Sequence, residues 1–256
     1  MSLYNNVVPP RFKFEHFGIS DTGKVRTRNE DSYICLPEQN LWVVADGMGG
    51  HDSGDYASNT ITEQAGKFIQ QSSLEDSILV LEENFLHSNE LIHSKAEKLG
   101  KDTTIGSTVA SLFTWDDLAF VLWAGDSRVY RYRQAQLERL TDDHSYVEEL
   151  VRMGKISDQE AEAHPASNVV LNAIGIDNAV FIDMEYSTIE DEDIYILCSD
   201  GLFKDLTETG MSQILEEKDA TIEQLTRQLL SAALDAGGSD NCTIVLVKAS
   251  IENDDV

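Results

Sequence analysis

Short apolar runs that stop at turn residues dominate the pattern of hydrophobic and polar positions along this chain. Runs of this length, bounded by glycine, serine, aspartate or asparagine, are typical of buried β-strands. An alternating stretch near the N-terminus predicts a further strand with one face toward solvent. The predicted strands are residues 12–18, 32–36, 41–45, 119–124, 194–198 and 242–247, together with consecutive strands across 105–132 that break at 116–117 and 125–126.

Three other stretches are predicted helices: residues 54–71, 74–99 and 221–236. Two of them carry the 3.6-residue apolar period of an amphipathic helix. In 74–99 the apolar stripe consists of Leu74, Ile78, Leu81, Phe85 and Ile92. The 221–236 helix starts at a capping box of Thr221 and Gln224, and its buried face is Ile222, Leu225, Leu229 and Ala233.

The segment 141–175 departs from the strand pattern and is predicted to form a flap between sheet strands. It contains two short helical stretches, 146–153 and 158–163. Asp142 and Asp143 directly precede the first stretch and are expected to cap it.

Strands from both halves of the chain have few crossover helices between them, which favours antiparallel sheets with helices packed outside. Residues 129–133 alternate as an edge strand does, and the acidic run 190–193 is expected to be a solvated turn. We therefore expect an α+β fold in one domain spanning residues 1–256, with a core at about 12–250 and the flap at about 141–175.

Composition changes this picture mainly through charge. The 256 residues carry 46 acidic and 19 basic side chains, a formal net charge of −27. Such a surface repels nucleic acid and anionic membranes, so we exclude both as main partners. Cys35, Cys198 and Cys242 lie in strand-like runs and are expected to be reduced thiols of a cytoplasmic protein. Residues 1–10 lack the pattern of a signal peptide, and no apolar run approaches the length of a membrane span.

Carboxylates stand where the predicted strands begin or end. They are Glu30, Asp31, Asp46, Asp126, Asp200 and Asp240. Carboxylates at strand ends can converge at one edge of a sheet, where they repel one another unless a cation neutralises them. Mg²⁺ and Mn²⁺ prefer such oxygen ligands. The pattern predicts a divalent-metal site in which Asp46 bridges two ions and the Gly47 carbonyl faces the same ion.

Two metal ions about 3.5–4 Å apart can hold a bridging hydroxide for in-line attack on phosphorus, so no serine or cysteine nucleophile is needed. Arg26 and Arg28 lie just before Glu30, and arginine forks match phosphate oxygens well. On spacing alone, surface salt bridges explain these two arginines equally well.

Five motifs follow one another in a fixed order along the chain. They are Val25-Arg26-Thr27-Arg28-Asn29-Glu30-Asp31, Asp46-Gly47-Met48-Gly49-Gly50, Gly125-Asp126-Ser127-Arg128, Ser199-Asp200-Gly201 and Ser239-Asp240-Asn241. With them the chain resembles the metal-dependent protein phosphatases of the PP2C type (PPM family), and within that family the bacterial members. Each motif alone is weak, but five in order are specific. The resemblance covers residues 14–248.

The resemblance implies a four-layer α/β/β/α sandwich and a site that holds two Mn²⁺ or Mg²⁺ ions, with a third ion in many members. Carried over to this sequence, the implied metal ligands are Asp46 as the bridge, the Gly47 carbonyl, Asp200, Asp240, Glu30 through water, and Asp126 for the third ion. Arg26 matches the phosphate-binding arginine, Asp31 stands behind the ligands, and the flap touches substrate.

The implied reaction is hydrolysis of phosphoserine and phosphothreonine in proteins by a hydroxide bridging two metals, without a covalent enzyme intermediate. The implied partners are phosphoproteins and a cognate serine/threonine kinase whose action the enzyme reverses. We expect a cytoplasmic monomer. Three alternatives stay open: a phosphatase-like binding module without catalysis, a metal-dependent phosphoesterase of small molecules, and a plain acidic cation-binding protein.

One position departs from the pattern of many eukaryotic relatives, which have a histidine where this chain has Met48. Histidine can act as a general acid there, whereas methionine has no proton to donate. The leaving group must then be protonated by metal-bound water or by another residue. His51 is expected to be a loop residue rather than a ligand, and His144 to support the site rather than catalyse.

Overall fold

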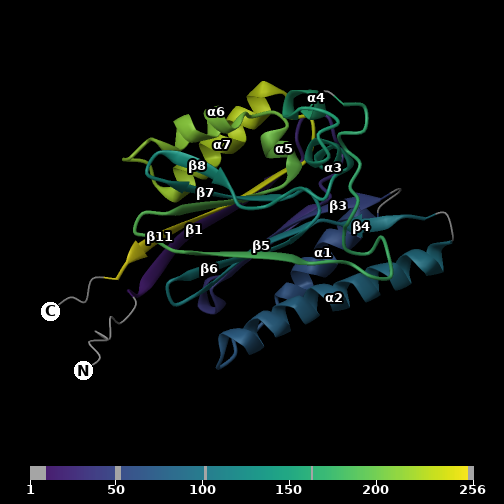
Figure 1. Cartoon of the computed structure of the whole chain (residues 1–256), viewed down its shortest axis with the longest axis horizontal. Coiled ribbons are helices and arrows are strands. Elements are labelled where there is room, and N and C mark those ends of the chain that lie inside the picture. The colour runs from purple at the N-terminus through teal and green to yellow at the C-terminus, as the bar shows by residue number, and fades with distance from the viewer. Residues whose placement is uncertain (1–9, 50–52, 101–102, 163, 253–256) are drawn as a thin grey trace.

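The computed structural model describes residues 10–49, 53–100, 103–162 and 164–252 (Figure 1). Gly50 and His51, as well as residues 1–9, on which the expectation about a signal peptide rests, lie outside the described residues. The strands are β1 Phe12–Asp21, β2 Asp31–Leu36, β3 Leu41–Gly49, β4 Ile105–Ser107, β5 Val109–Trp115, β6 Leu118–Ala124, β7 Arg128–Arg133, β8 Gln136–Arg139, β9 Asp183–Thr188, β10 Ile194–Cys198 and β11 Cys242–Ile251. The helices are α1 Gly54–Ala65, α2 Leu74–Leu99, α3 Tyr146–Arg152, α4 Asp158–Glu162, α5 Asp200–Phe203, α6 Glu208–Leu215 and α7 Ile222–Ala236, with a short 3-10 turn at Pro37–Gln39.

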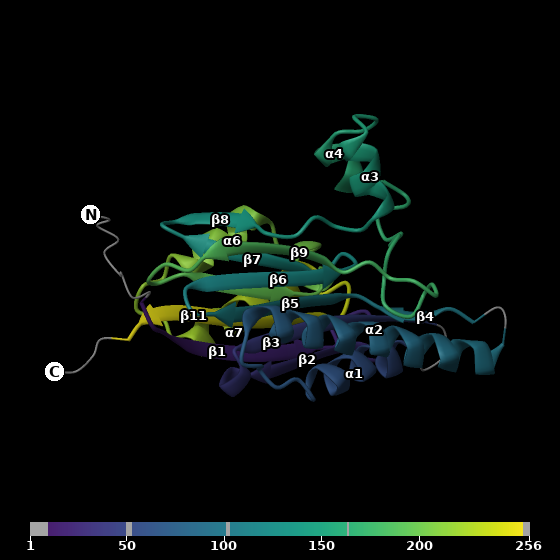
Figure 2. The same cartoon turned by 60° about the horizontal axis from the view of Figure 1, so that its bottom comes forward.

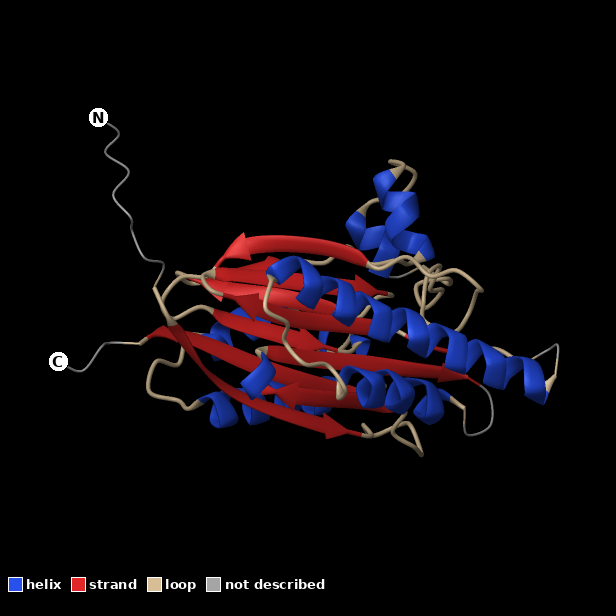
Figure 3. Cartoon of the chain, turned by 90° about the horizontal axis from the view of Figure 1, so that it is seen from below, coloured by secondary structure: helices blue, strands red, loops and turns tan. Residues whose placement is uncertain are grey.

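The strands form two antiparallel sheets that stack face to face (Figure 1), and the long helix α2 crosses the outer face of one of them (Figure 3). One sheet has the order β1-β11-β10-β7-β8, and the other has the order β2-β3-β5-β6-β9 with β4 paired to the end of β3. Helices α1 and α2 cover the second sheet, and α6 and α7 cover the first (Figure 1). The α+β class and the α/β/β/α layering expected from the sequence are confirmed.

Three apolar layers hold these four layers together. Between the sheets lie fully buried side chains, among them Trp42, Tyr195 and Val245. A second layer joins α1 and α2 to their sheet, and a third joins α5, α6 and α7 to theirs. The stripe predicted on residues 74–99 faces the second layer, with Leu81, Phe85 and Ile92 fully buried. The capping box of Thr221 and Gln224 is present and α7 buries its predicted face.

Helix α1 is shorter than the sequence predicts, because it ends at Ala65 rather than at residue 71. Gly66 follows it and closes the last turn by donating its N–H to the carbonyl of Thr62 at 2.9 Å. Glycine weakens a helix through its backbone entropy. The N–H groups of Lys67 and Phe68 still reach the carbonyls three residues earlier, both at 3.0 Å, whereas those of Gln70 and Gln71 bond to the side chains of Gln39 at 2.7 Å and Ser77 at 2.9 Å.

The prediction that residues 129–133 form an edge strand is wrong. Strand β7 lies between β10 and β8. Its alternation has another cause: Tyr130 and Tyr132 pack under the helices, while Arg131 and Arg133 face the opposite side at the rim. The true edge, β8, is a short polar segment that gives no strand signal of its own.

The acidic run 190–193 is not simply a solvated turn, because Asp193 is fully buried. Its carboxylate accepts two hydrogen bonds from Arg133, at 2.7 and 2.6 Å. A buried charge needs such a partner, since removing it from water without one is costly. The partner lies 60 residues away in the sequence, so local composition could not reveal it.

The segment 141–175 contains the two predicted short helices, α3 and α4, which stand away from the stacked sheets (Figure 2). The cap of α3 differs from the prediction. Ser145, rather than Asp142 or Asp143, caps the helix by accepting the N–H of Glu148 at 3.2 Å. None of the helices in the described part of the chain is long and apolar enough to cross a membrane.

Candidate metal centre

The topology brings carboxylates from both sheets to one end of the sandwich. In the β2–β3 pairing, Asp31 is the direct partner of Asp46 near the end of β3. In the other sheet, β10 ends just before Asp200 and β11 begins just after Asp240. These two strands are neighbours and run antiparallel. The end of one and the start of the other therefore lie side by side, facing Asp31 and Asp46 across the stack.

Hydrogen bonds between the sheets fix this arrangement. One carboxylate oxygen of Asp31 accepts from the hydroxyls of Ser199 and Thr243, both at 2.7 Å. Asn241 accepts the backbone N–H of Glu30 at 2.8 Å and donates its amide group to the carbonyl of Arg28 at 2.8 Å. The loop that carries Arg26 and Glu30 is thus tied to the turn that carries Asp240.

Glycines allow the backbone segments of the site to approach very closely. A Cβ atom added to Gly47 would lie 2.1 Å from the carbonyl oxygen of Gly54 and 2.5 Å from that of Glu30. A Cβ on Gly54 would lie 2.7 Å from the carboxyl carbon of Glu30, whose carboxylate accepts the Gly54 N–H. At Gly201 the added Cβ would lie 2.0 Å from the carbonyl oxygen of Asn241. Any side chain at these positions would push the carboxylates apart.

Two cationic side chains contact the aspartates. Arg26 donates to Asp240 at 2.7 Å, and Lys204, four residues after Asp200 on the same helical turn, forms an ion pair with Asp200. The Arg26 side chain remains 54% exposed, so a guanidinium held at the aspartates also reaches solvent. The sequence left open whether Arg26 forms a salt bridge or binds phosphate. The structure shows a salt bridge, and its partner Asp240 is itself a carboxylate of the site.

The turn around Asp126 is joined to the same centre. The Asp46 N–H donates to the Thr108 hydroxyl at 3.1 Å, and this hydroxyl is 2.6 Å from that of Ser127. Asp126 itself is buried. Gly125 has a positive φ of 112°, and a Cβ there would lie 2.6 Å from Thr108, so the tight turn requires glycine.

The carboxylates repel one another in the absence of a cation. Burial raises the pKa of Asp46, and the charges of Asp31, Asp200, Asp126 and Asp240 raise this pKa further. A site that disfavours its own ionised form in this way is suited to a bound cation.

Two buried oxygens also fit a cation. One carboxylate oxygen of Asp31 and one of Asp200 are buried without a hydrogen-bond partner. Hard divalent ions take oxygen ligands of this kind. Within the described residues, no three carboxylate, thiolate or imidazole side chains are gathered tightly enough to enclose an ion as they stand. Arg26 and Lys204 hold two of the aspartates instead, and the donor set as a whole fits Mg²⁺ or Mn²⁺.

The raised pKa values predict how the stability of the metal-free protein depends on pH. Burial raises the pKa of both Asp31 and Asp126 to about 7, well above that of an unfolded aspartate. The folded state therefore binds more protons than the unfolded state between about pH 4 and pH 7. The contribution of these two carboxyl groups to the free energy of unfolding is fully present at the acidic end of this range and is lost as pH rises through it.

We expect the melting temperature of chelator-treated protein to fall by about 5 °C or more between pH 5 and pH 8. Added Mn²⁺ should flatten this dependence, because the ion replaces the protons. Differential scanning fluorimetry checks both statements. A melting temperature that rises with pH over this range without metal would contradict the account of repelling carboxylates.

The sequence pattern singles out Asp31, Asp46, Asp126, Asp200 and Asp240, whose charges act on one another here, but not the groups around them. Lys204 was not singled out, although its i, i+4 spacing from Asp200 was a usable signal. Asn241, Ser199 and Ser127 stood within the five motifs without an assigned part. The buried Thr108, which bonds to both Asp46 and Ser127, carries no local signal at all.

His144 supports the neighbouring turn. Its Nδ1 accepts from the N–H of Gly125 at 3.2 Å and faces the amide of Asn172 at 2.8 Å. Its Nε2 lies 3.0 Å from the carboxylate of Asp183. The ring also stacks on Trp123. These contacts fix the imidazole ring between the Gly125 turn, Asn172 and Asp183.

Comparison with known proteins places the chain in a family. The family described as Protein phosphatase 2C matches residues 24–236. Protein phosphatase PhpP of Streptococcus pneumoniae is 32% identical over 241 residues, which are 92% of this chain and 97% of that protein. Serine/threonine phosphatase stp of Listeria monocytogenes is also 32% identical, over 91% of this chain and 94% of its own length.

A solved structure agrees with this assignment. The catalytic domain of the serine threonine protein phosphatase PstP in complex with two manganese ions superposes with a TM-score of 0.82 at 26% identity, covering 94% of this chain and 100% of that one. The chain therefore belongs to the protein phosphatase 2C family and is a protein phosphatase of the bacterial type.

Proposed function

We propose that this chain is a single cytoplasmic phosphatase domain, spanning residues 1–256, which hydrolyses phosphoserine and phosphothreonine in proteins and so reverses a serine/threonine kinase. The observation that carries the proposal is the meeting of Asp46, Asp200 and Asp240 beside the exposed guanidinium of Arg26. Carboxylates alone would suit any cation site. An arginine fork next to them suits a phosphate group bound at the cation.

The residues that would hold two Mn²⁺ or Mg²⁺ ions are Asp46 between both, the Gly47 carbonyl, Asp200 and Asp240 on one side, and Glu30 through water on the other, with Asp126 open to a third ion. When bound, these ions would activate water as the nucleophile, so hydrolysis needs no covalent enzyme intermediate. Asp31, held by Ser199 and Thr243, would keep Asp46 in place from behind.

Arg26 would bind the phosphate oxygens of the substrate. To do so its guanidinium must share or leave the ion pair with Asp240. This exchange is favourable when the charge of Asp240 is engaged by a metal ion. Metal binding and phosphate binding would thus reinforce one another through one arginine.

The proposed substrate class is tested with three peptides of one sequence that carry phosphoserine, phosphothreonine or phosphotyrosine. We expect release of phosphate from the first two in the presence of Mn²⁺. An enzyme of small molecules would instead prefer a free phosphate ester and show no gain from the peptide. That result would remove the protein-substrate proposal while leaving the metal site intact.

Met48 leads to a separate prediction about the leaving group. It lies on β3 next to Gly47, in the position where a histidine could donate a proton. We expect Met48→His to raise kcat on the phosphothreonine peptide by up to about tenfold and to leave kcat on an activated aryl phosphate nearly unchanged, because only the alkoxide needs protonation. Comparable pH–rate profiles for both substrates in the variant would show that no acid is missing.

A further inference from the structure

The flap, residues 141–175, is joined to the rest of the protein mainly through its stem, which consists of residues 141–145 and 170–175 at its two ends. Helix α3 has no buried residue, and Figure 2 shows α3 and α4 projecting beyond the sheets. The two chains of the stem pair with each other, where the Leu171 N–H donates to the His144 carbonyl at 2.7 Å. The stem also meets the turn before β7, where the His144 N–H donates to the Gly125 carbonyl at 2.9 Å. The orientation of the flap is therefore decided at the stem.

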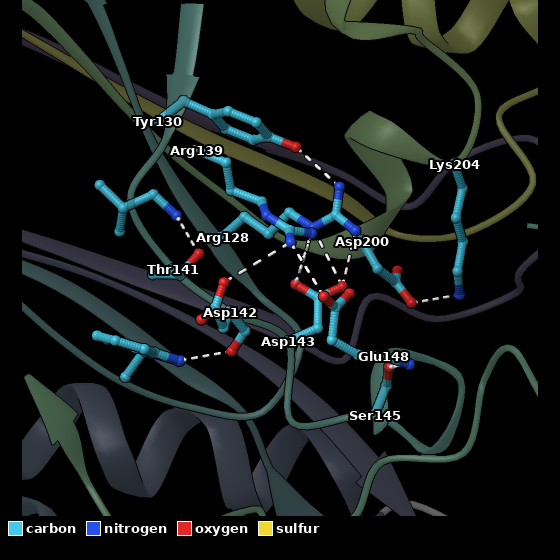
Figure 4. A network of polar contacts seen from close by, with 12 residues as sticks. Arg128, Tyr130, Arg139, Thr141, Asp142, Asp143, Ser145, Glu148, Asp200 and Lys204 are labelled. Carbon is cyan, nitrogen blue, oxygen red and sulfur yellow. Dashed lines mark hydrogen bonds and ion pairs between the residues drawn. The ribbon is translucent and has the colours of Figure 1, made fainter. Parts of the chain in front are cut away.

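Arg128, the first residue of β7, binds the stem from the sheet through Asp143 (Figure 4). It donates through Nε at 2.9 Å and through Nη2 at 2.7 Å to the carboxylate of Asp143, which is the bidentate geometry that only arginine offers. Its Nη1 donates to the Tyr130 hydroxyl at 2.9 Å. Its guanidinium carbon lies 3.7 Å from the centre of the Phe203 ring. One side chain thus contacts the flap stem, the sheet and helix α5.

Two of the segments joined by Arg128, the turn before β7 and helix α5, carry candidate metal ligands. Arg128 follows Asp126 by two residues, and Phe203 follows Asp200 by three residues on α5. In the β7–β10 pairing, Arg128 stands directly opposite Cys198, just before Asp200. The ion pair is well shielded, with the side chains of Arg128 and Asp143 only 17% and 8% exposed. Shielding from water strengthens such a pair, and it makes the loss of either hydrogen bond costly.

A second arginine makes longer contacts that reach helix α3 of the flap. Arg139 donates to Glu148 on α3 at 3.3 Å and lies 3.8 Å from Asp143 (Figure 4). The carboxylate of Asp143 is therefore shared between an arginine beside the metal ligands and one that contacts the flap.

We propose that Arg128 is a positioning residue that fixes the flap in one orientation over the metal centre, through Asp143 on the stem and Phe203 on α5. The inference rests on the proposed function only in that the flap meets a peptide substrate. A macromolecular substrate depends on the flap, whereas a small aryl phosphate reaches the metal centre without it. Loss of the Arg128–Asp143 pair should therefore lower kcat/KM for a peptide far more than kcat/KM for an aryl ester.

The test is Arg128→Lys, which keeps the charge but loses the fork and the stacking on Phe203. Arg133→Lys is the matched control. Arg133 lies at the other end of the same strand and makes an equally shielded bidentate pair with Asp193, 18% and 0% exposed. Both variants remove a bidentate guanidinium–carboxylate pair from the same strand, but only Arg128 contacts the flap stem. Asp143→Asn provides a second variant in case Arg128→Lys folds poorly.

Two readouts separate positioning from general destabilisation. The first is kcat/KM on a phosphothreonine peptide divided by kcat/KM on an aryl phosphate, in Mn²⁺. We expect this ratio to fall about tenfold in Arg128→Lys and in Asp143→Asn, and to stay within about twofold of wild type in Arg133→Lys. The second is hydrogen exchange of the backbone across residues 146–170, which needs no activity. Exchange there should quicken only in the stem variants.

The proposal is overturned if Arg128→Lys and Asp143→Asn lower kcat/KM for both substrates by the same factor. It is also overturned if hydrogen exchange across residues 146–170 in these variants matches that of Arg133→Lys. If the wild-type protein hydrolyses neither substrate, the proposed function fails, and the exchange comparison still decides whether Arg128 anchors the flap. The two failures are thus distinguishable.

Discussion

Asparagine in place of Asp46 is expected to lower kcat/KM of the Mn²⁺-supplied protein by at least about a thousandfold. Four carboxylates of the site, Asp31, Asp200, Asp126 and Asp240, raise the pKa of Asp46. A neutral amide in this position removes the charge that both proposed ions share. The measurement is the initial rate of phosphate release under saturating Mn²⁺.

The control for this change is Asp116→Asn, which makes the same substitution in the hairpin between β5 and β6. Asp116 has a positive φ of 52°, a backbone conformation that asparagine adopts readily. This variant should keep wild-type activity and stability. If Asp46→Asn retained more than about a tenth of the wild-type rate while binding Mn²⁺ normally, the bridging part given to Asp46 would be wrong.

Removal of the Arg26 side chain is the second large effect. We expect Arg26→Ala to raise KM for the phosphothreonine peptide by about 30-fold or more, because charge-assisted bonds to phosphate are lost. Arg26→Lys should lie between the alanine variant and wild type, since lysine keeps the charge but cannot form a fork. Inhibition by the product, inorganic phosphate, should weaken in parallel.

A surface arginine on helix α7 supplies the comparison for Arg26. Arg227 is similarly exposed, at 56%, and pairs with Glu223 on α7. Arg227→Ala should leave KM unchanged. Equal KM values for Arg26→Ala and Arg227→Ala would return Arg26 to the alternative of a surface salt bridge.

The sequence predicts the layers of this fold because its strongest signals are local. Apolar runs bounded by turn residues identify β3, β6, β10 and β11, and a capping box identifies the start of α7. Strand β9 escaped notice because its residues Asp183–Thr188 mix charges, methionine and tyrosine and stay mostly exposed. Such an edge strand is defined by its partner β6, not by its own composition.

The convergence of the carboxylates could also be predicted, since strand ends gather at the edge of a sheet. The groups that hold them could not, because each partner depends on register. Asp143 was expected to cap a helix, yet it pairs with Arg128, which the β7–β10 register places at the stem. Asp193 was expected in solvent, yet it is buried against Arg133. In both cases the local sequence suggested one role for an aspartate, whereas the fold pairs it with an arginine on β7.

We propose that this site is a metal-dependent phosphatase centre. Its most direct test is phosphate release from a phosphothreonine peptide by wild type and Asp200→Asn, each measured with Mn²⁺ and with chelator. We expect wild type to release phosphate only with Mn²⁺, and this release to collapse in Asp200→Asn. Folded, Mn²⁺-supplied wild type that releases no phosphate, even from an aryl ester, would contradict the claim and favour a binding module without catalysis.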